Sequence, residues 1–149
     1  MDTQTTGNYY TINHLALASG LTDRTIRTYI STGILQGEKI NGLWHFTPEQ
    51  VDAFFNHPAV RPSILAKKNA LIYDFLAMDK SKEETCIILD FPEGNQKETM
   101  EFFCYEINNG NFTNIHFSFD NYKKSSRVIL KGYTQDVLQL VNKFYSLGK

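Results

Sequence analysis

The chain has 149 residues, of which 42% are hydrophobic and 21% charged, and its formal net charge is −1. This composition is typical of a globular protein and excludes a disordered chain or a strongly basic nucleic-acid-binding protein. The beginning of the chain lacks a signal-peptide pattern, and no apolar run approaches the roughly 18 residues of a membrane span. We therefore expect a cytoplasmic protein with no membrane partner.

Two short helices separated by a tight turn are predicted at the start of the chain. Thr11 is placed to cap a first helix over residues 12–19, and Gly20 to end it in a left-handed turn. Thr22 is placed to cap a second helix over residues 23–32. Two short helices joined by a glycine-containing turn form a helix-turn-helix.

The second helix has one apolar and one polar face. Ile26 and Ile30 are four residues apart and would pack on the first helix. Polar and basic side chains at spacings of three and four would occupy the opposite face: Arg24, Arg27, Thr28 and Ser31.

A hairpin is predicted next, because Asn41 and Gly42 stand between two short extended segments. Its strands would cover residues 39–40 and 43–46. A helix-turn-helix followed by a hairpin is a winged helix-turn-helix. In that arrangement the second helix can enter the major groove of DNA while the wing contacts the backbone.

Two further helices are predicted before the middle of the chain. Thr47 and Gln50 form a capping box for the third helix, whose buried stripe would be Val51, Phe54 and Phe55. The fourth helix, over residues 63–78, has a stripe broad enough to pack on two neighbours, with a second subunit as one candidate. Lys67 and Lys68 would form a solvated face. The stripe consists of Ile64, Leu65, Leu71, Ile72, Phe75 and Leu76.

The second half of the chain predicts a small α+β sandwich. Its expected elements are a buried strand (85–91), a helix (92–109), a strand with one face buried (111–120), a strand (126–132) and a helix capped by Thr134. The side chains expected to point inward from the last helix are Val137, Leu138, Val141 and Phe144. This order is that of a ferredoxin-like fold without its last strand.

The predicted fold class is therefore α+β, with three parts. Residues 1–61 would form the winged helix-turn-helix, 62–84 a connecting helix and linker, and 85–149 a dimerisation or effector-sensing domain. Without a last strand, the apolar strand over residues 85–91 would stand at a sheet edge, and exposed apolar edges invite pairing. We expect this edge to be covered by the fourth helix or to pair with a second copy.

The N-terminal motifs resemble the DNA-binding domain of the MerR family of bacterial transcription regulators. The resemblance begins near Tyr10 and is carried by Thr25-Ile26-Arg27-Thr28-Tyr29, by Gly33-Ile34-Leu35 and, after the wing, by Phe46-Thr47-Pro48-Glu49-Gln50-Val51. It implies that Arg27 and Tyr29 clamp the DNA backbone and that Arg24 and Thr25 lie near base edges. It also implies a homodimer on a two-fold operator in double-stranded DNA, and it allows for an unidentified small-molecule effector.

The wing departs from the MerR pattern. Trp44 and Glu38-Lys39 stand where MerR-like wings usually carry arginines. Because each neutralised phosphate contributes about one unit of salt slope, we expect modest affinity that depends on dimerisation. Lys39, Asn41 and His45 would support DNA binding from the wing together with Arg24, Thr25, Arg27, Thr28 and Tyr29, while Trp44 is as well explained by packing.

No catalytic or metal site is predicted. The four histidines and two cysteines show no metal-ligand spacing, and there is no phosphate-binding loop or nucleophile motif, so we expect neither an enzyme nor a cofactor. Cys86 and Cys104 fit small buried hydrophobes. The carboxylates of Asp90 and Glu93 are better explained by a turn at a strand end and a helix cap than by a catalytic pair. His116 and Asp120 are better explained by a solvated strand face than by a ligand pocket.

The sequence thus favours a dimeric, sequence-specific DNA-binding transcriptional regulator. An excisionase-like architectural DNA-binding protein is the alternative in the same class. A protein-interaction module with a degenerate helix-turn-helix is the alternative in another class, and it is retained because the charge of the first half is balanced. A small enzyme built on the second half is a third, weaker alternative.

Overall fold

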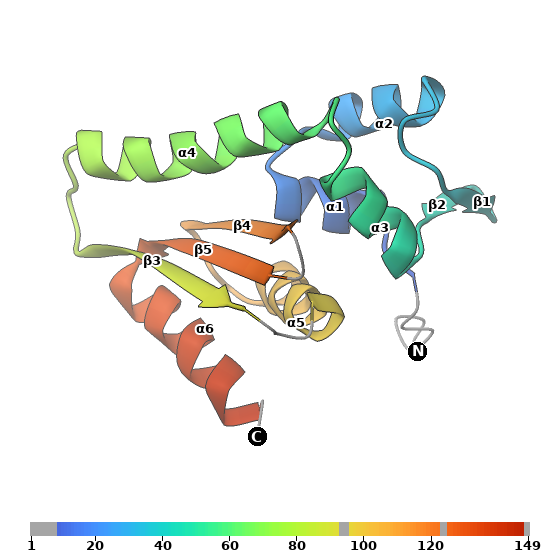
Figure 1. The fold of residues 1–149 in the computed structure, drawn as a ribbon. Helices are drawn as coiled ribbons and strands as arrows, with labels where there is room; N and C mark the ends of the chain where they lie inside the picture. Colours follow the sequence, from blue (N-terminus) through green and yellow to red (C-terminus); the bar gives the residue numbers. More distant parts are fainter. Residues whose placement is uncertain (1–8, 93–95, 123–124, 148–149) are drawn as a thin grey trace. The chain divides into compact units, whose positions relative to one another are not determined.

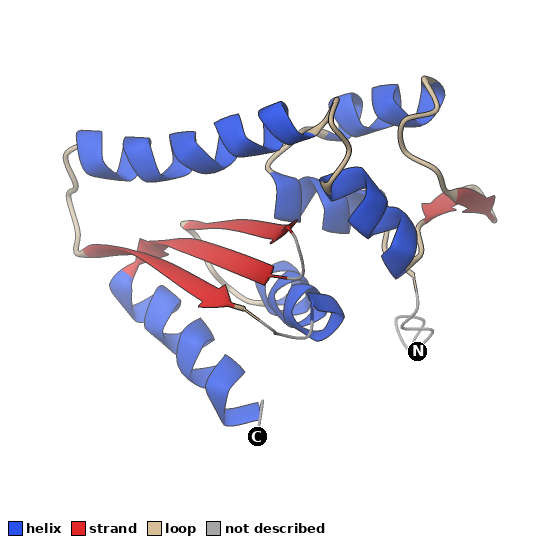
Figure 2. Cartoon of the chain, viewed as in Figure 1, coloured by secondary structure: helices blue, strands red, loops and turns tan. Residues whose placement is uncertain are grey.

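The computed structural model describes residues 9–92, 96–122 and 125–147. These residues form six helices and five strands in two antiparallel sheets, so the chain is an α+β protein (Figures 1 and 2). It divides into two compact units, Met1–Lys67 and Lys68–Lys149, with the boundary inside helix α4 (Arg61–Ala77).

The first unit begins with two capped helices, as predicted. Helix α1 (Ile12–Ser19) starts after Thr11, whose side chain accepts a hydrogen bond from the His14 backbone, and ends at Gly20 with φ 81°. Helix α2 (Asp23–Ser31) starts after Thr22, whose hydroxyl accepts from the Thr25 backbone N–H, and ends one residue earlier than predicted.

A two-stranded hairpin and a third helix complete this part of the first unit. Strands β1 (Glu38–Ile40) and β2 (Leu43–His45) pair across Asn41 and Gly42, whose φ angles of 52° and 83° fit the mirror-image turn that matches strand twist. Helix α3 (Pro48–Phe55) has the predicted capping box.

The core of the first unit is built from the predicted apolar faces. Ile26 of α2 is fully buried, and Val51 of the α3 stripe is buried. The other fully buried side chains of this core are Leu15, Leu35, Phe46, Phe54 and Phe55. Gly37 lies against the Phe46 ring, since a Cβ on Gly37 would come within 2.4 Å of it. Tyr10 adds a short bridge to Phe46, extending the hairpin by backbone hydrogen bonds of 2.7 and 2.8 Å.

The second unit contains a three-stranded sheet with two helices on one face (Figure 1). Its elements are β3 (Glu84–Phe91), α5 (Gln96–Asn109), β4 (Ile115–Tyr122), β5 (Ser125–Tyr133) and α6 (Thr134–Leu147), and the strand order is β3-β5-β4. The helices pack through aromatic rings: Phe103 of α5 stacks on Phe117 of β4 at 5.7 Å and on Phe144 of α6 at 5.0 Å.

The structure corrects several predictions for the strands. The strand over residues 85–91 exists and lies at an edge of the sheet, as predicted, but none of its residues is buried. In β4, Ser118 and Asp120 are buried, so only His116 of the face predicted to be solvated is exposed. Residues 93–95, at the predicted start of the following helix, lie outside the described residues; α5 is described from Gln96.

The helices also differ from the prediction in which residues they bury. In α4 only Ile64 of the predicted stripe is buried, while Leu65 and Leu76 are exposed. In α6 Leu138 is exposed and Leu140 is buried instead. Residue spacing predicts that a helix has an apolar face, but it does not predict which segment of the chain covers that face.

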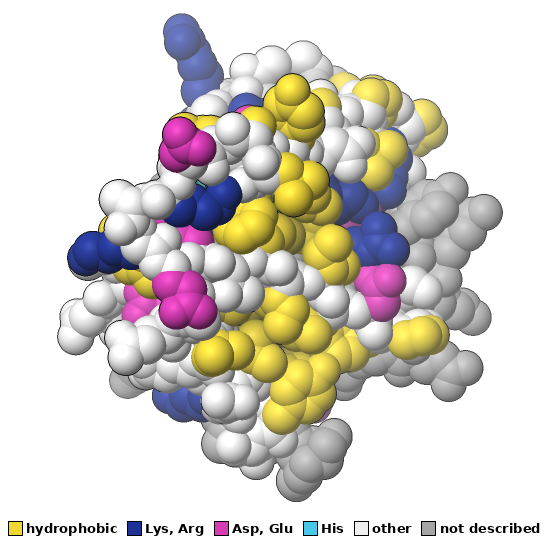
Figure 3. All heavy atoms as spheres, turned by 90° about the vertical axis from the view of Figure 1, so that its left-hand side faces the viewer, with side chains coloured by type: hydrophobic (Ala, Val, Ile, Leu, Met, Phe, Trp, Pro, Cys, Tyr) yellow, Lys and Arg dark blue, Asp and Glu magenta, His cyan; other side chains and the backbone are white. Residues whose placement is uncertain are grey.

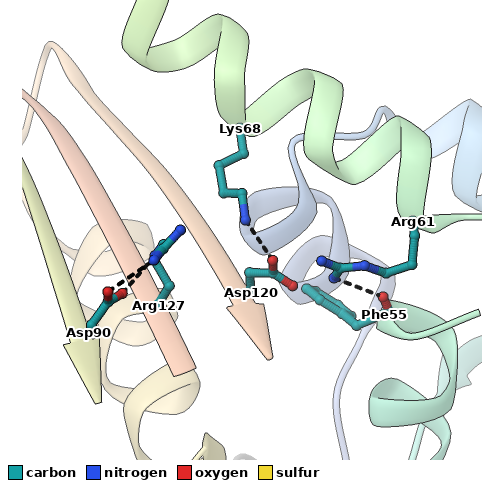
Figure 4. A network of polar contacts seen from close by, with 6 residues as sticks. All are labelled: Phe55, Arg61, Lys68, Asp90, Asp120 and Arg127. Carbon is teal, nitrogen blue, oxygen red and sulfur yellow. Dashed lines mark hydrogen bonds and ion pairs between the residues drawn. The ribbon is translucent and has the colours of Figure 1, made fainter. Parts of the chain in front are cut away.

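The burial of Lys68 contradicts its predicted exposure. Its side chain was expected to be solvated, yet Lys68 is buried in the second unit and its Nζ lies 2.7 Å from Asp120 Oδ2 (Figure 4). The two residues are 52 positions apart in the sequence, so no local pattern indicates the pair. The neighbouring Lys67 is exposed, as predicted.

Candidate nucleic-acid interface

The face of α2 opposite its buried Ile26 is exposed to solvent. Arg24, Arg27, Thr28 and Ser31 are all exposed, which agrees with the polar face predicted from their spacing. The hydroxyl of Thr28 donates to the Arg24 carbonyl, and that of Ser31 donates to the Thr28 carbonyl. These hydroxyls keep their acceptor lone pairs, and the Arg24 guanidinium makes no hydrogen bond or ion pair with any described residue.

Arg27 is held by an acidic neighbour one turn earlier. Its Nε donates to Asp23 Oδ1 at 2.6 Å, and the two side chains are 57% and 61% exposed. The i, i+4 spacing of the pair is visible in the sequence, and it is the signal from which this ion pair could have been predicted. Because the pair is exposed, its net strength is small. A phosphate oxygen could therefore replace the carboxylate at modest cost.

Two of the expected contact residues have structural roles inside the first unit. Thr25 is half-buried, and its hydroxyl accepts a hydrogen bond from Thr22 at 3.0 Å at the start of α2. The Tyr29 ring is half-buried and packs edge-on against Phe54 at 5.6 Å. This contact joins α2 to α3 and fixes the orientation of the tyrosine.

The hairpin presents a mixed surface. Lys39 and Asn41 are exposed, and Lys39 Nζ lies 5.9 Å from the centre of the Trp44 ring, a cation–π distance. Trp44 itself is half-buried and stacks on Phe46, with ring planes 11° apart. The packing explanation for Trp44 therefore holds for one side of its indole.

His45 lies deeper in the hairpin than its predicted role requires. The residue is half-buried, its ring is 5.4 Å from that of Tyr9, and its Nδ1 is buried with no hydrogen-bond partner among the residues that the structure describes. Of the three wing residues singled out from the sequence, Lys39 and Asn41 are the accessible ones.

His14 takes part in the cap of the first helix. Its Nδ1 accepts a hydrogen bond from the Thr11 backbone N–H at 3.0 Å, completing the capping box. Burial lowers the pKa of His14 from its usual value. This shift favours the neutral imidazole, which is the form that can accept this hydrogen bond.

The polar residues of the second unit form structural pairs. Asp90, opposite Arg127 in the β3–β5 ladder, accepts from Arg127 Nε and Nη2 at 2.6 and 2.9 Å (Figure 4). The Arg127 hydrogen bond is the main cause that lowers the pKa of Asp90. Asp120 forms an ion pair with Lys68. His116, four residues earlier in the same strand, is exposed, and its pKa is lowered mainly by desolvation.

Among the described residues, no group of three or more His, Cys, Asp and Glu side chains is arranged to hold a metal ion. Burial raises the pKa of Cys104 to about 12, which leaves its thiol protonated at neutral pH. Within the same described ranges, no helix combines the length and apolar character that crossing a bilayer requires.

Comparison with known proteins adds no relative: no family model matches the chain, and no curated protein or solved structure is significantly similar to it.

Proposed function

We propose that this protein is a sequence-specific DNA-binding transcriptional regulator whose first unit is a MerR-like winged helix-turn-helix. The observation that carries the proposal is the exposed face of α2, where Arg24, Arg27 and Thr28 stand opposite the buried Ile26. A helix of this size enters the major groove of B-DNA, and arginine can read guanine or bind phosphate there. The wing adds Lys39 and Asn41 at the backbone.

The second unit, a β-α-β-β-α sandwich in the order of a ferredoxin-like fold without its last strand, would serve dimerisation or effector sensing. Two copies would then bind the two half-sites of a two-fold operator. Such a protein acts in the cytoplasm and performs no catalysis.

Asp23 moderates the affinity of this surface. Arg27 must exchange the Asp23 carboxylate, 2.6 Å away, for a phosphate, and the carboxylate remains to repel the DNA. The small positive charge of the surface and this internal competition together explain why modest affinity is expected.

The experiment measures binding of the full chain to the duplex upstream of its own coding sequence over a salt series, beside an unrelated duplex of equal length. Affinity should fall with salt, and Arg27→Ala should lower the slope of log K against log salt by about one unit. Lys97→Ala is the matched control, because Lys97 also forms an i, i+4 ion pair, half-exposed, but lies on α5. It should leave the slope unchanged.

Asp23→Asn should tighten binding, since it frees Arg27 and removes a repelling charge. Glu49→Gln, which removes the same charge from the first turn of α3, should not. If the wild-type chain does not shift either duplex at low salt, the proposal is wrong and the protein-interaction module takes its place. Equal affinity for both duplexes would instead favour an architectural, non-specific role.

A further inference from the structure

The open edge of β3 has the features of a strand that pairs with another strand. No residue of β3 is buried, whereas β4, at the other edge of the same sheet, is buried throughout residues 117–121. The pairing of β3 with β5 runs without a bulge from Glu84 to Phe91. Soluble proteins usually shield such edges with bulges, charges or a covering segment.

The hydrogen-bond ladder identifies the groups that point outward. Thr134 N–H donates to the Glu83 carbonyl, so residues 83 and 134 form a hydrogen-bonded pair in the β3–β5 register. Such pairs alternate along an antiparallel ladder. The backbone groups of residues 85, 87, 89 and 91 therefore face β5. Those facing the open edge belong to Glu84, Cys86, Ile88 and Asp90.

The middle of this edge is apolar. Ile88 is 48% exposed although it lies at the centre of the strand. Helix α6 packs on β3 and β5, and its exposed large apolar side chains, Leu138 and Tyr145, are seven residues apart on one helix face. Figure 3 shows apolar side chains gathered on the face of the molecule that it presents.

The geometry points to a second copy of this chain as the partner of β3, paired antiparallel about a two-fold axis at Ile88. This inference deepens the proposed function, because it supplies the dimer that a two-fold operator needs. Ile88 would oppose Ile88 of the second copy, and Cys86 would oppose Asp90. By symmetry Asp90 would also oppose Cys86, and each of the resulting three pairs would exchange two backbone hydrogen bonds and join the two sheets into one.

Side-chain chemistry selects this register over its neighbours. A two-fold axis at Ile87 would place Glu84 directly opposite Asp90, and like charges opposite one another are destabilising. An axis at Cys86 would place Ile88 opposite Glu84. With the axis at Ile88, the helix-covered face pairs Ile87 with Leu89 and Thr85 with Phe91. Asp90 keeps its Arg127 partner on the other face.

The test measures the mass of the full chain by light scattering at tens of micromolar, without DNA. The wild type should have the mass of a dimer, and Ile88→Lys should halve it, because two lysines would meet on the axis. Tyr105→Lys is the matched control: Tyr105 is 53% exposed on α5, the helix that packs on β4 rather than on β3. This variant should remain dimeric.

A second variant separates pairing from folding. Proline at 88 removes an N–H that faces the open edge and leaves the β3–β5 hydrogen bonds intact. Ile88→Pro should therefore be monomeric with an unchanged far-UV circular dichroism spectrum. A monomeric wild type, or a dimer that survives both Ile88 variants, overturns the inference. The inference is also overturned if Leu76→Lys breaks the dimer and neither Ile88 variant does. That result would place the interface on α4, whose most exposed apolar residue is Leu76.

The register has its own measurement. In this register Cys86 lies opposite position 90 of the second copy, about 5.5 Å away between Cα atoms. Asp90→Cys should therefore be crosslinked into a dimer by a short bifunctional thiol reagent. The wild type should not, because its two Cys86 residues lie four positions apart along the paired strands. Crosslinking of the wild type would show that the axis is not at Ile88.

This test and the DNA test fail independently. A dimer that ignores DNA would leave the β3 pairing intact and refute the proposed function. A monomer that binds DNA with the expected salt slope would refute the β3 pairing and support the proposed DNA binding.

Discussion

At the scale of single residues, the buried charge of Lys68 has the largest consequence for stability. Its side chain and that of Asp120 are only 8% and 5% exposed, with 2.7 Å between Nζ and Oδ2. Removing one partner of a buried pair leaves the other charged without solvent, which typically costs about 3–5 kcal/mol. The arrangement is a constraint on sequence more than a source of stability.

Lys68→Met should therefore lower the free energy of unfolding by an amount in this range, measured by urea denaturation. Lys67→Met, at the exposed neighbouring position, should change it by no more than about 0.5 kcal/mol. Adding Asp120→Leu to Lys68→Met should recover part of the loss, because the stranded carboxylate is then gone. Equal effects of the two lysine variants would contradict a buried pair.

At the scale of elements, the caps decide where the helices of the first unit begin. Each of α1, α2 and α3 starts with a threonine whose hydroxyl accepts a backbone N–H, and the α1 and α3 caps are reciprocal boxes. The α1 box is unusual because its second member, His14, can be protonated. Protonating Nδ1 would remove the acceptor that the Thr11 N–H uses.

We expect this cap to make stability depend on pH. Because burial lowers the folded-state pKa of His14 below 6.5, the unfolded chain binds the proton more readily. The contribution to stability is therefore complete above about pH 6.5 and is lost as the pH falls from there through the folded-state pKa. The pKa of His116 is shifted in the same direction and adds to the effect.

His14→Gln keeps the capping box, since glutamine accepts the same hydrogen bond without titrating. The difference between the free energies of unfolding at about pH 7.5 and pH 5 should be smaller in this variant than in the wild type. Each unit of pKa depression corresponds to about 1.4 kcal/mol. An unchanged difference would show that His14 titrates normally in the folded chain.

At the scale of the whole molecule, the two proposals make a joint prediction. If β3 pairing forms the dimer, the second half-site is bound by a unit already attached to the first, and such linkage raises affinity by about 10²–10⁴-fold. Ile88→Lys should lose this factor on a duplex with both half-sites. It should bind a single half-site as the wild type does, as measured by fluorescence anisotropy. Equal affinity of the two proteins for the two-fold duplex would contradict the coupling.

Much of the local structure could be predicted because its determinants lie within a few residues of one another. The threonine caps, the left-handed Gly20 and the Asn41–Gly42 turn act over three or four positions, and each is found where it was expected. The polar face of α2 is exposed for the same reason, since helical spacing alone separates it from Ile26. The contact of Tyr29 with Phe54, which depends on how two helices pack, was not predicted.

By itself, the sequence determined the helices, the hairpin, the α+β class and the residues that α2 presents to solvent, because period and capping are local properties. Tertiary structure alone decided that Lys68 is buried beside Asp120 and that Leu138 and Leu76 are exposed. Each of these depends on which distant segment covers a side chain. The spacing of apolar residues predicts which side chains share a face of a helix or strand. Only tertiary packing determines which face is buried in the protein and which is exposed to water.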